Sequence, residues 1–440
     1  MFDHAASQLL GWSDDRAVTW AELRERIAGL SLEKADAVIA CAQPFNFLAA
    51  LLALWQRGGE ALIPASLQPD AIAAAGSYVL RDHDLKRGQS NFSVTKRASA
   101  ANDLFQENCS DPFSCRLALY TSGSTGAPKR VEKTLAQLAR EIQNLQALWG
   151  STLKRACVLS TVPHYHIYGL LFRVLWPLAA GRPADETTCA DPLQLRALAK
   201  KRGPYVLVST PAHLARFPDL LPLSEWERPE LIFSSGGPLD AAAAARYRDA
   251  WGAAPLEVFG STETGGVAWR QRDGSQLEDA WTPFPGIGIA LGHDGALRLD
   301  SPYLAERDWR MDDAAELLPD GRFLLRGRLD RVVKVEGKRL SLPQLEQLLA
   351  KHRWVSVACA VALPGPQRVG VVVVPSAAGA AALSSEGQRA VRDALRAHLA
   401  TALEPSVLPR SYRFVDALPY DERGKLQAAA IEQLFAGEKW

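Results

Sequence analysis

The chain has 440 residues, 48% of them hydrophobic and 22% charged, so it is long enough for two or three soluble domains with sizeable cores. Lysine and arginine total 50 against 49 acidic residues, and this balance excludes the strong net charge typical of proteins that bind nucleic acid or membrane surfaces. The six cysteines are scattered without metal-ligand spacing, and no apolar run approaches the roughly 18 residues of a membrane span, so we expect a reduced, cytoplasmic protein.

Helical and strand-like patterns alternate over the first part of the chain. The predicted helices span residues 20–30, 46–56 and 135–149, and the predicted strands span residues 37–42, 117–121, 156–161 and 205–209. A further helix is expected over residues 241–251, where Asp240 is placed to cap its first turn. This alternation is typical of α/β layering.

The pattern changes from Gly321 onward. Short strands and amphipathic helices follow, including a strand over residues 371–374 and a helix over residues 388–399. We therefore predict a domain boundary near Asp330, with residues 1–329 in a large domain and residues 330–440 in a small α+β domain.

A loop rich in glycine and hydroxyl groups follows the predicted strand at 117–121. Gly123 and Gly126 allow main-chain N–H groups to converge on an anion, and Lys129 adds a positive charge. The hydroxyl donors of the loop are Thr121, Ser122, Ser124 and Thr125. The spacing is not that of a Walker A loop. The loop predicts a polyphosphate site, and the alternative is a surface turn rich in serine and glycine.

This loop resembles the phosphate motif of the adenylate-forming superfamily, which includes acyl-CoA synthetases, luciferases and nonribosomal adenylation domains. The resemblance extends, in the family's order, from Val18–Leu23 to Gly424–Lys425. It implies an ATP-dependent enzyme that joins a carboxylic acid to AMP and passes the acyl group to a thiol. The implied fold is α/β: a large N-terminal domain of two α/β layered sheets plus a β-structure, with a small mobile α+β lid. Arg130 replaces the family's usual glycine.

Residues 259–263 resemble the family's aromatic-Gly-x-Thr-Glu motif. Mg²⁺ usually takes one or two carboxylates plus phosphate oxygens, which suits Glu263. Thr262 can donate a hydrogen bond to the α-phosphate, and the ring of Phe259 can stack on adenine. Taken alone, the motif equally fits a capped helix start.

Three glycines are assigned to the nucleotide by the same resemblance. They are Gly236, Gly237 and Gly260. The turn that contains the first two is expected to wrap adenine and to line the acyl pocket.

Asp313 matches the family's ribose-binding aspartate when counted back from Gly321. A carboxylate suits paired ribose hydroxyls because it can accept two hydrogen bonds. The family's usual Thr-Gly-Asp reads Met-Asp-Asp here, so Asp312 is an alternative, as is an acidic surface turn. Arg328 falls in a segment that resembles the family's hinge, and we expect it to reach ribose or phosphate, while the small domain takes a different orientation for each half-reaction.

Lys425 lies in a stretch, Leu418–Lys425, that resembles the family's terminal catalytic loop. A mobile cation between the attacking carboxylate and the α-phosphate would stabilise the charge that develops there. Position alone would favour a flexible tail lysine instead.

Residues 163–170 fall where the family carries an aromatic-His gate beside the acyl pocket. His166, which we expect in the active site, stands where amino-acid activators carry an aspartate that pairs with the substrate ammonium. An aryl or fatty acid is therefore favoured. The aromatic surroundings suit a hydroxylated ring, although His164 and Tyr168 equally fit satisfied core residues.

The shortness of the chain and residues 166–178 resemble the compact ligases of bacterial aryl polyene pigment pathways. That resemblance implies a hydroxybenzoate-like or cinnamate-like acid, with the phosphopantetheine of an acyl carrier protein, or CoA, as acceptor. Arg389, Arg392 and Arg396 recur at helical spacing, which fits docking of an acidic carrier protein or, more simply, a solvated helix face. Two rival functions are a fatty acyl-CoA ligase and a non-catalytic nucleotide-binding relative.

Overall fold

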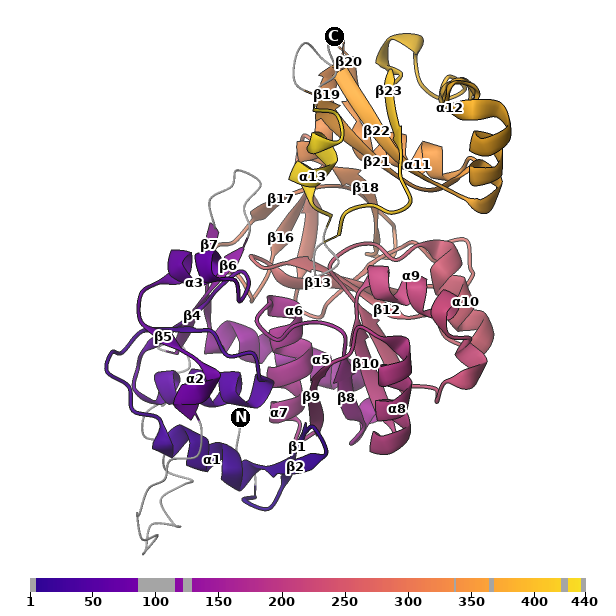
Figure 1. Ribbon diagram of the computed structural model, residues 1–440. Coiled ribbons are helices and arrows are strands. Elements are labelled where there is room, and N and C mark those ends of the chain that lie inside the picture. Colours follow the sequence, from indigo (N-terminus) through magenta and orange to yellow (C-terminus); the bar gives the residue numbers. More distant parts are fainter. Residues whose placement is uncertain are drawn as a thin grey trace, which may run out of the picture. The chain divides into compact units, whose positions relative to one another are not determined.

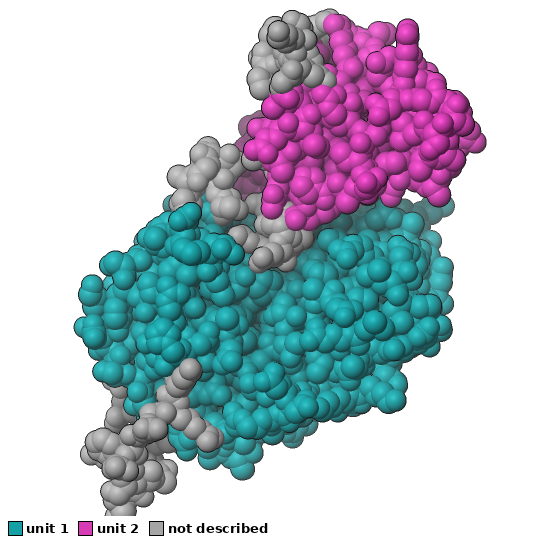
Figure 2. All heavy atoms as spheres, viewed as in Figure 1, with its two compact units in different colours: residues 1–288, 300–307 teal, residues 289–299, 308–440 magenta. Residues whose placement is uncertain are grey.

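The computed structural model describes residues 5–85, 115–121, 129–335, 338–363, 368–420 and 426–436. The chain divides into two compact units, coloured separately in Figure 2. The first comprises residues 1–288 and 300–307, and the second comprises residues 289–299 and 308–440. Among the helices of the described ranges, none is both long and apolar enough to cross a membrane.

The first unit contains a nine-stranded sheet. Its strands are β1 (Leu9–Ser13), β2 (Arg16–Thr19), β8 (Cys157–Ser160), β9 (Ala184–Thr188), β10 (Tyr205–Ser209), β11 (Leu231–Ser234), β12 (Leu256–Ser261), β13 (Gly265–Gln271) and β14 (Thr282–Pro283). They lie in the order β14-β13-β12-β11-β10-β8-β9-β1-β2. Strands β8, β10, β11 and β12 run parallel and are mostly buried, as expected for a sheet covered on both faces. β13 returns antiparallel to β12, so a turn joins these two strands.

Helices cover both faces of this sheet. On one side, visible in Figure 1, lie α8 (Pro192–Arg202), α9 (Pro211–Leu220) and α10 (Ala241–Trp251), whose apolar side chains form one core cluster with β8 and β10. On the other side, Phe233 of β11 packs edge-on against Trp149 and Trp176. These two tryptophans come from α5 (Leu135–Leu153) and α7 (Trp176–Ala179).

A five-stranded sheet completes the first unit. Its strands lie in the order β5 (Val79–Leu80), β3 (Ala37–Ile39), β4 (Glu60–Ile63), β6 (Arg116–Thr121) and β7 (Lys129–Thr134). The accompanying helices are α1 (Trp20–Gly29), α2 (Pro44–Gln56) and α3 (Pro69–Ala75). β6 and β7 pair antiparallel, with Thr121 opposite Lys129, so the predicted phosphate loop joins two adjacent strands.

The second unit contains three smaller sheets. They are β15 (Gly288–Leu291), β16 (Ala296–Asp300), β17 (Trp309–Leu317) and β18 (Phe323–Arg328); β19 (Val332–Val335) and β20 (Lys338–Ser341); and β21 (Val355–Leu363), β22 (Arg368–Pro375) and β23 (Ser411–Phe414). Its helices are α11 (Leu342–Ala350), α12 (Ala377–Leu399) and α13 (Ala428–Gln433). α12 contains a non-helical residue, Gly387, immediately before the helix predicted from residue 388.

The fold class expected from the sequence is confirmed: a mixed α/β protein with several sheets and a small C-terminal α+β domain. The expected boundary between residues 329 and 330 falls inside the second unit, directly after β18, and stays a prediction about where the chain swivels. The sequence led us to expect reduced cysteines, and one cysteine departs from this expectation. Cys115 is disulfide-bonded, whereas Cys41, Cys157, Cys189 and Cys359 are buried free thiols.

Candidate active site

The β6–β7 hairpin brings Lys129 to an acidic partner that is distant in sequence. Thr121, the last residue of β6, donates from Oγ1 to the carbonyl oxygen of Lys129 at 3.5 Å. The Nζ atom of Lys129 donates to Oε1 of Glu263 at 2.7 Å. This ion pair therefore connects the predicted phosphate motif with the predicted motif at residues 259–263. The remaining predicted loop residues, Ser122, Gly123, Ser124, Thr125 and Gly126, lie outside the described residues.

Glu263 lies in the turn between β12 and β13. Phe259 and Gly260 are on β12, and Thr262 precedes Glu263 in the turn, where it is half-buried. A side chain at Gly260 would meet the carbonyl oxygen of Gly265 at 2.1 Å, so this position accepts glycine alone. The ring of Phe259 lies 5.5 Å from that of Trp281. The motif is therefore a β-hairpin end and not the alternative helix start.

The carboxylate of Glu263 is held in its charged form. Burial opposes ionisation, but the hydrogen bond and positive charge of Lys129 outweigh it and hold the pKa of Glu263 below its ordinary value. Its side chain remains 24% exposed. An ionised, accessible carboxylate beside a lysine is suited to a site where a cation and an anion bind together.

The predicted adenine turn follows β11. Gly236 adopts φ +92°, a conformation that favours glycine, and a Cβ atom added there would meet nothing within 4 Å. At Gly237 such a Cβ would touch only Pro211, at 4.0 Å. Asp240 caps α10 through the N–H groups of Ala242 and Ala243, as predicted. Among the described residues, the turn therefore leaves its main chain at Gly236 uncovered.

A buried ionic network anchors the end of this turn. The Glu257 carboxylate accepts from the Leu239 N–H at 2.9 Å and from Nε and Nη2 of Arg270, each at 2.9 Å. Arg272 donates to Glu257 Oε1 at 2.5 Å and to the Leu239 carbonyl at 2.8 Å. Both hydrogen-bonding groups of the Leu239 main chain are thus satisfied by one network.

The aromatic-His segment lies at the start of α6 (Ile167–Gly169). His166 is the N-cap residue, and its ring packs edge-on against Tyr165, with centroids 4.7 Å apart. His164 is a satisfied core residue, because it is buried and its Nε2 is 3.0 Å from the Cys41 carbonyl oxygen. Burial lowers the pKa of His164 to about 3, so its ring is neutral. Of the two histidines, only His166 remains a candidate for substrate contact.

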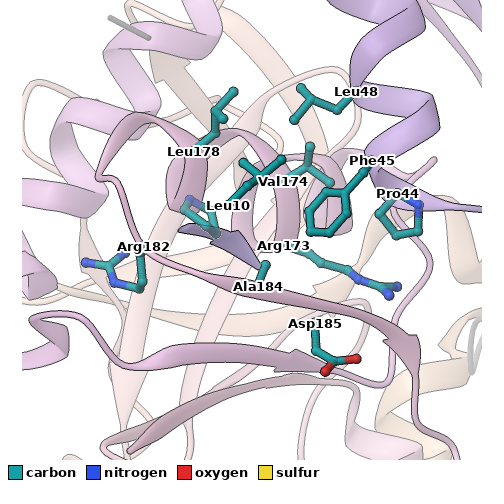
Figure 3. Close-up of a pocket in the computed structure, with 11 residues that line it drawn as sticks. Leu10, Pro44, Phe45, Leu48, Arg173, Val174, Leu178, Arg182, Ala184 and Asp185 are labelled. Atoms are coloured by element: carbon teal, nitrogen blue, oxygen red, sulfur yellow. The ribbon is translucent and has the colours of Figure 1, made fainter. Parts of the chain in front are cut away.

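A buried arginine steadies this segment. Arg173 donates to the carbonyl oxygens of Val162 and Glu186 and to Thr188 Oγ1, the first at 2.8 Å and the last at 2.7 Å. Burial lowers its pKa to about 10, so it stays charged. A small cavity of about 10 Å³ lies beside Arg173 and is also lined by Leu10. Both side chains are labelled in Figure 3. That volume is about the least that holds one water, so this cavity is not an acid pocket.

An aromatic patch extends from the same segment. The ring of Tyr168 lies 4.9 Å from that of Phe172, which in turn lies 5.1 Å from that of Phe233. Burial raises the pKa of Tyr168 well above its ordinary value, so its hydroxyl stays neutral. Tyr168 is half-buried, whereas Phe172 and Phe233 belong to the buried core.

In the second unit, Asp313 and Arg328 are directly opposite each other on β17 and β18. Their closest charged atoms, Oδ2 and Nη1, are 3.9 Å apart. The Asp313 side chain is 13% exposed and that of Asp312 is 52% exposed, so Asp313 is the better enclosed of the two alternatives. Lys425 lies outside the described residues.

Arg130 contacts two carboxylates. Its Nη2 lies 2.5 Å from Oε2 of Glu60, and its Nη1 pairs with Glu132. Its charge is therefore offset within the five-stranded sheet.

Sequence reasoning missed four buried charged residues that support the site: Lys133, Glu141, Arg173 and Glu257. Lysine and glutamate are ordinary on solvent-exposed faces, so these positions gave no signal by type. Arg270 on β13 and Arg272 just after it lie two residues apart, and this spacing could have indicated a shared acidic partner such as Glu257.

Two family models and a curated relative match this chain. Residues 68–302 match the family described as AMP-binding enzyme, and residues 344–425 match the family described as AMP-binding enzyme C-terminal domain. The 4-coumarate–CoA ligase of Cereibacter sphaeroides is 31% identical over 314 residues, which cover 71% of this chain and 70% of that protein.

Two solved structures have a similar fold. ATP-bound MatB from Rhodopseudomonas palustris superposes with a TM-score of 0.75 at 20% identity, covering 97% of this chain and 95% of that one. A benzoate CoA ligase from Burkholderia xenovorans superposes with a TM-score of 0.72 at 18% identity, covering 97% of each chain.

Proposed function

We propose that the acid adenylated by this chain, which belongs to the family of AMP-binding enzymes and is an acid–thiol ligase, is a hydroxyaryl acid. One observation carries the proposal. Lys129, next to the phosphate loop, and Glu263, 134 residues further along, meet in an ion pair of 2.7 Å. These two residues come from separate motifs that the sequence assigns to one nucleotide.

In the first half-reaction, a carboxylate oxygen of the acid attacks the α-phosphorus of ATP, and pyrophosphate leaves. Lys129 and the N–H groups of the phosphate loop would hold the departing phosphates, and Thr262 would donate to the α-phosphate. Phe259, Gly236 and Gly237 would enclose adenine. No general base is required, because the carboxylate of the acid is already ionised near neutral pH.

ATP requires a cation beside its phosphates, and the residues present fit Mg²⁺. No cluster of three or more acidic, histidine or cysteine side chains suited to a metal occurs among the residues described, so the protein would supply one carboxylate, Glu263. Mg²⁺ commonly binds in this way, with phosphate oxygens and water as its other ligands. When bound, it would neutralise phosphate charge; the side chain of Lys129 would meanwhile turn from Glu263 towards phosphate.

In the second half-reaction, a thiol sulfur attacks the acyl carbon, and AMP leaves with the bridging oxygen. We propose that Lys425 serves only the first step, that Asp313 accepts hydrogen bonds from the ribose hydroxyls, and that Arg328 contacts ribose or phosphate. A change in orientation of the small domain would exchange Lys425 for the thiol.

The acid is proposed to be of the hydroxybenzoate or hydroxycinnamate type. His166 offers no carboxylate to an α-ammonium group, and the half-buried rings of Tyr165 and Tyr168 in the same segment suit an aromatic acid. The curated relative from Cereibacter sphaeroides is named for 4-coumarate, a hydroxycinnamate.

The acceptor is proposed to be the thiol of CoA or of carrier-bound phosphopantetheine. The relative's name favours CoA. For a carrier protein, α12 offers Arg389 and Arg392 at the edge of a groove of about 610 Å³ that contains no acidic side chain. Membership of the aryl polyene ligases and a cytoplasmic location belong to the same proposal.

The test is exchange of labelled pyrophosphate into ATP, measured with hydroxybenzoates, hydroxycinnamates, fatty acids and amino acids. We expect exchange with hydroxyaryl acids. Exchange with fatty acids alone would support a fatty acyl-CoA ligase instead. Absence of exchange with every acid, together with ATP binding, would support a non-catalytic relative.

A further inference from the structure

Two charged side chains are buried beneath the Glu263 turn. Lys133 on β7 is 4% exposed and Glu141 on α5 is 5% exposed. Lys133 Nζ donates to the carbonyl oxygens of Glu263 at 2.5 Å and Tyr303 at 3.0 Å. Glu141 Oε1 accepts from the Gly266 N–H at 2.7 Å. The main chain of the turn is therefore held at Glu263 itself and at Gly266, three residues later.

Burial of these groups is unfavourable by itself. It lowers the pKa of Lys133 and raises the pKa of Glu141 to about 7, with the charge of each favouring ionisation of the other. Apolar residues of similar size would carry no such cost. The hydrogen bonds that these charged groups make to the main chain of the turn offset part of this cost.

The fit between the turn and α5 is close. Gly265 has φ +67°, and a Cβ atom there would lie 2.5 Å from Glu141 Oε2. At Gly266 a Cβ atom would lie 2.9 Å from Glu141 Oε1. Both glycines therefore allow the main chain to reach the carboxylate.

One strand holds both ends of Glu263. Lys129 and Lys133 lie four residues apart on β7, so their side chains project from the same face of the strand. Lys129 binds the carboxylate of Glu263, and Lys133 binds its carbonyl oxygen. β7 begins at Lys129, the last residue of the predicted phosphate loop, so both contacts come from the strand that follows this loop.

We propose that Lys133 and Glu141 are positioning residues that fix the main chain at Glu263 and at Gly266 and so present the Glu263 carboxylate to Lys129 at the start of β7. Lys133 acts from the strand that follows the loop, and Glu141 acts from α5. The role of these two residues in ATP binding rests on the proposed function. The experiment that tests whether they fix the turn does not require catalytic turnover.

The test is hydrogen exchange of the peptide that covers residues 259–271 in ATP-free protein, combined with calorimetric titration with ATP. Lys133→Met keeps the stem and removes the donors. We expect exchange within residues 259–271 to rise about tenfold and the Kd for ATP to rise about tenfold, because a hydrogen bond from a charged donor is lost. Exchange over β8 and β10 should not change.

Glu141 provides a matched pair of variants. Glu141→Gln keeps an acceptor for the Gly266 N–H, whereas Glu141→Leu removes it, so exchange should rise more in the second. The double variant Lys133→Met with Glu141→Gln removes both buried charges; it should regain thermal stability but keep the fast exchange and the weak ATP binding. Lys200→Met, an exposed lysine on α8, is the control.

Three results would overturn the inference: unchanged exchange at 259–271 in Lys133→Met, an equal rise across the whole first unit, or an unchanged Kd for ATP. If wild-type protein binds no ATP, the proposed function fails, while the exchange data still decide whether Lys133 and Glu141 fix the turn.

Discussion

The candidate site residues of the two units are held in different ways. In the first unit, the main chain at Glu263 and at Leu239 is held by buried charged side chains at 2.5–2.9 Å. In the second unit, Asp313 and Arg328 are opposite each other, but their charged atoms are 3.9 Å apart and the Arg328 side chain is 47% exposed. The first unit thus holds its candidate residues through buried charged groups, and the second unit pairs two of its candidates across neighbouring strands. We expect the contacts of Asp313 and Arg328 to change between the two half-reactions.

The largest effect is expected at Lys425. Replacement by alanine should reduce pyrophosphate exchange about 1,000-fold, because the cation between the carboxylate and the α-phosphate is lost. The rate of thioester formation from a supplied acyl adenylate should change by less than about threefold. Both steps are measured by rapid quench, with the exposed Lys351→Ala as control. Equal losses in both steps would contradict the role of Lys425.

Next comes the buried network of the first unit. Glu257→Leu leaves Arg270 and Arg272 buried without their counter-charge and should cost about 3–5 kcal/mol of unfolding free energy. The measurement is urea unfolding followed by tryptophan fluorescence. Glu225→Leu removes the exposed partner of Arg196 and should cost under about 1 kcal/mol. Similar losses in the two variants would show that the network does not anchor the turn.

A smaller effect is expected at Glu263. Glu263→Gln should lower kcat about 100-fold and raise the Mg²⁺ concentration needed for half-maximal activity, because a neutral amide is a poor ligand for a hard cation. The usual pKa of a glutamate is about 4.3. In the wild type, the lowered pKa of Glu263 keeps its carboxylate ionised at pH values somewhat below that. The stabilisation from its ion pair is therefore present above that pH and lost as the pH falls through the folded-state pKa. An unchanged Mg²⁺ dependence would contradict the assignment.

The smallest effect is expected at Asp313. Asp313→Ala should raise the KM for ATP about tenfold, because two hydrogen bonds to ribose are lost, and leave the KM for the acid unchanged. Asp312→Ala is the matched control, and its KM for ATP should not change. If Asp312→Ala has the larger effect, the register of the ribose site is wrong by one residue.

The sequence predicted the elements with regular patterns. Residues 205–209 and 241–251 match β10 and α10, and the predicted helix at 135–149 matches α5, which extends to Leu153. The cap at Asp240 is confirmed because its acceptor geometry depends only on neighbouring residues. Local patterns of this kind are sufficient for secondary structure.

Contacts distant in sequence could not be predicted in the same way. The motifs indicated that Lys129 and Glu263 serve one ligand, but nothing in the sequence indicated that Lys133 and Glu141 would be buried under the same turn. Their side chains are ordinary on amphipathic elements, and only the packing of β7 and α5 against the β12–β13 turn gives them partners.

The most direct test of carboxylate activation is an isotope transfer. The acid is labelled with ¹⁸O in both carboxylate oxygens, and the AMP released with CoA is analysed by mass spectrometry. Attack of the carboxylate on the α-phosphorus predicts AMP that carries one ¹⁸O atom from the acid. Unlabelled AMP, or release of ADP in its place, would contradict the account.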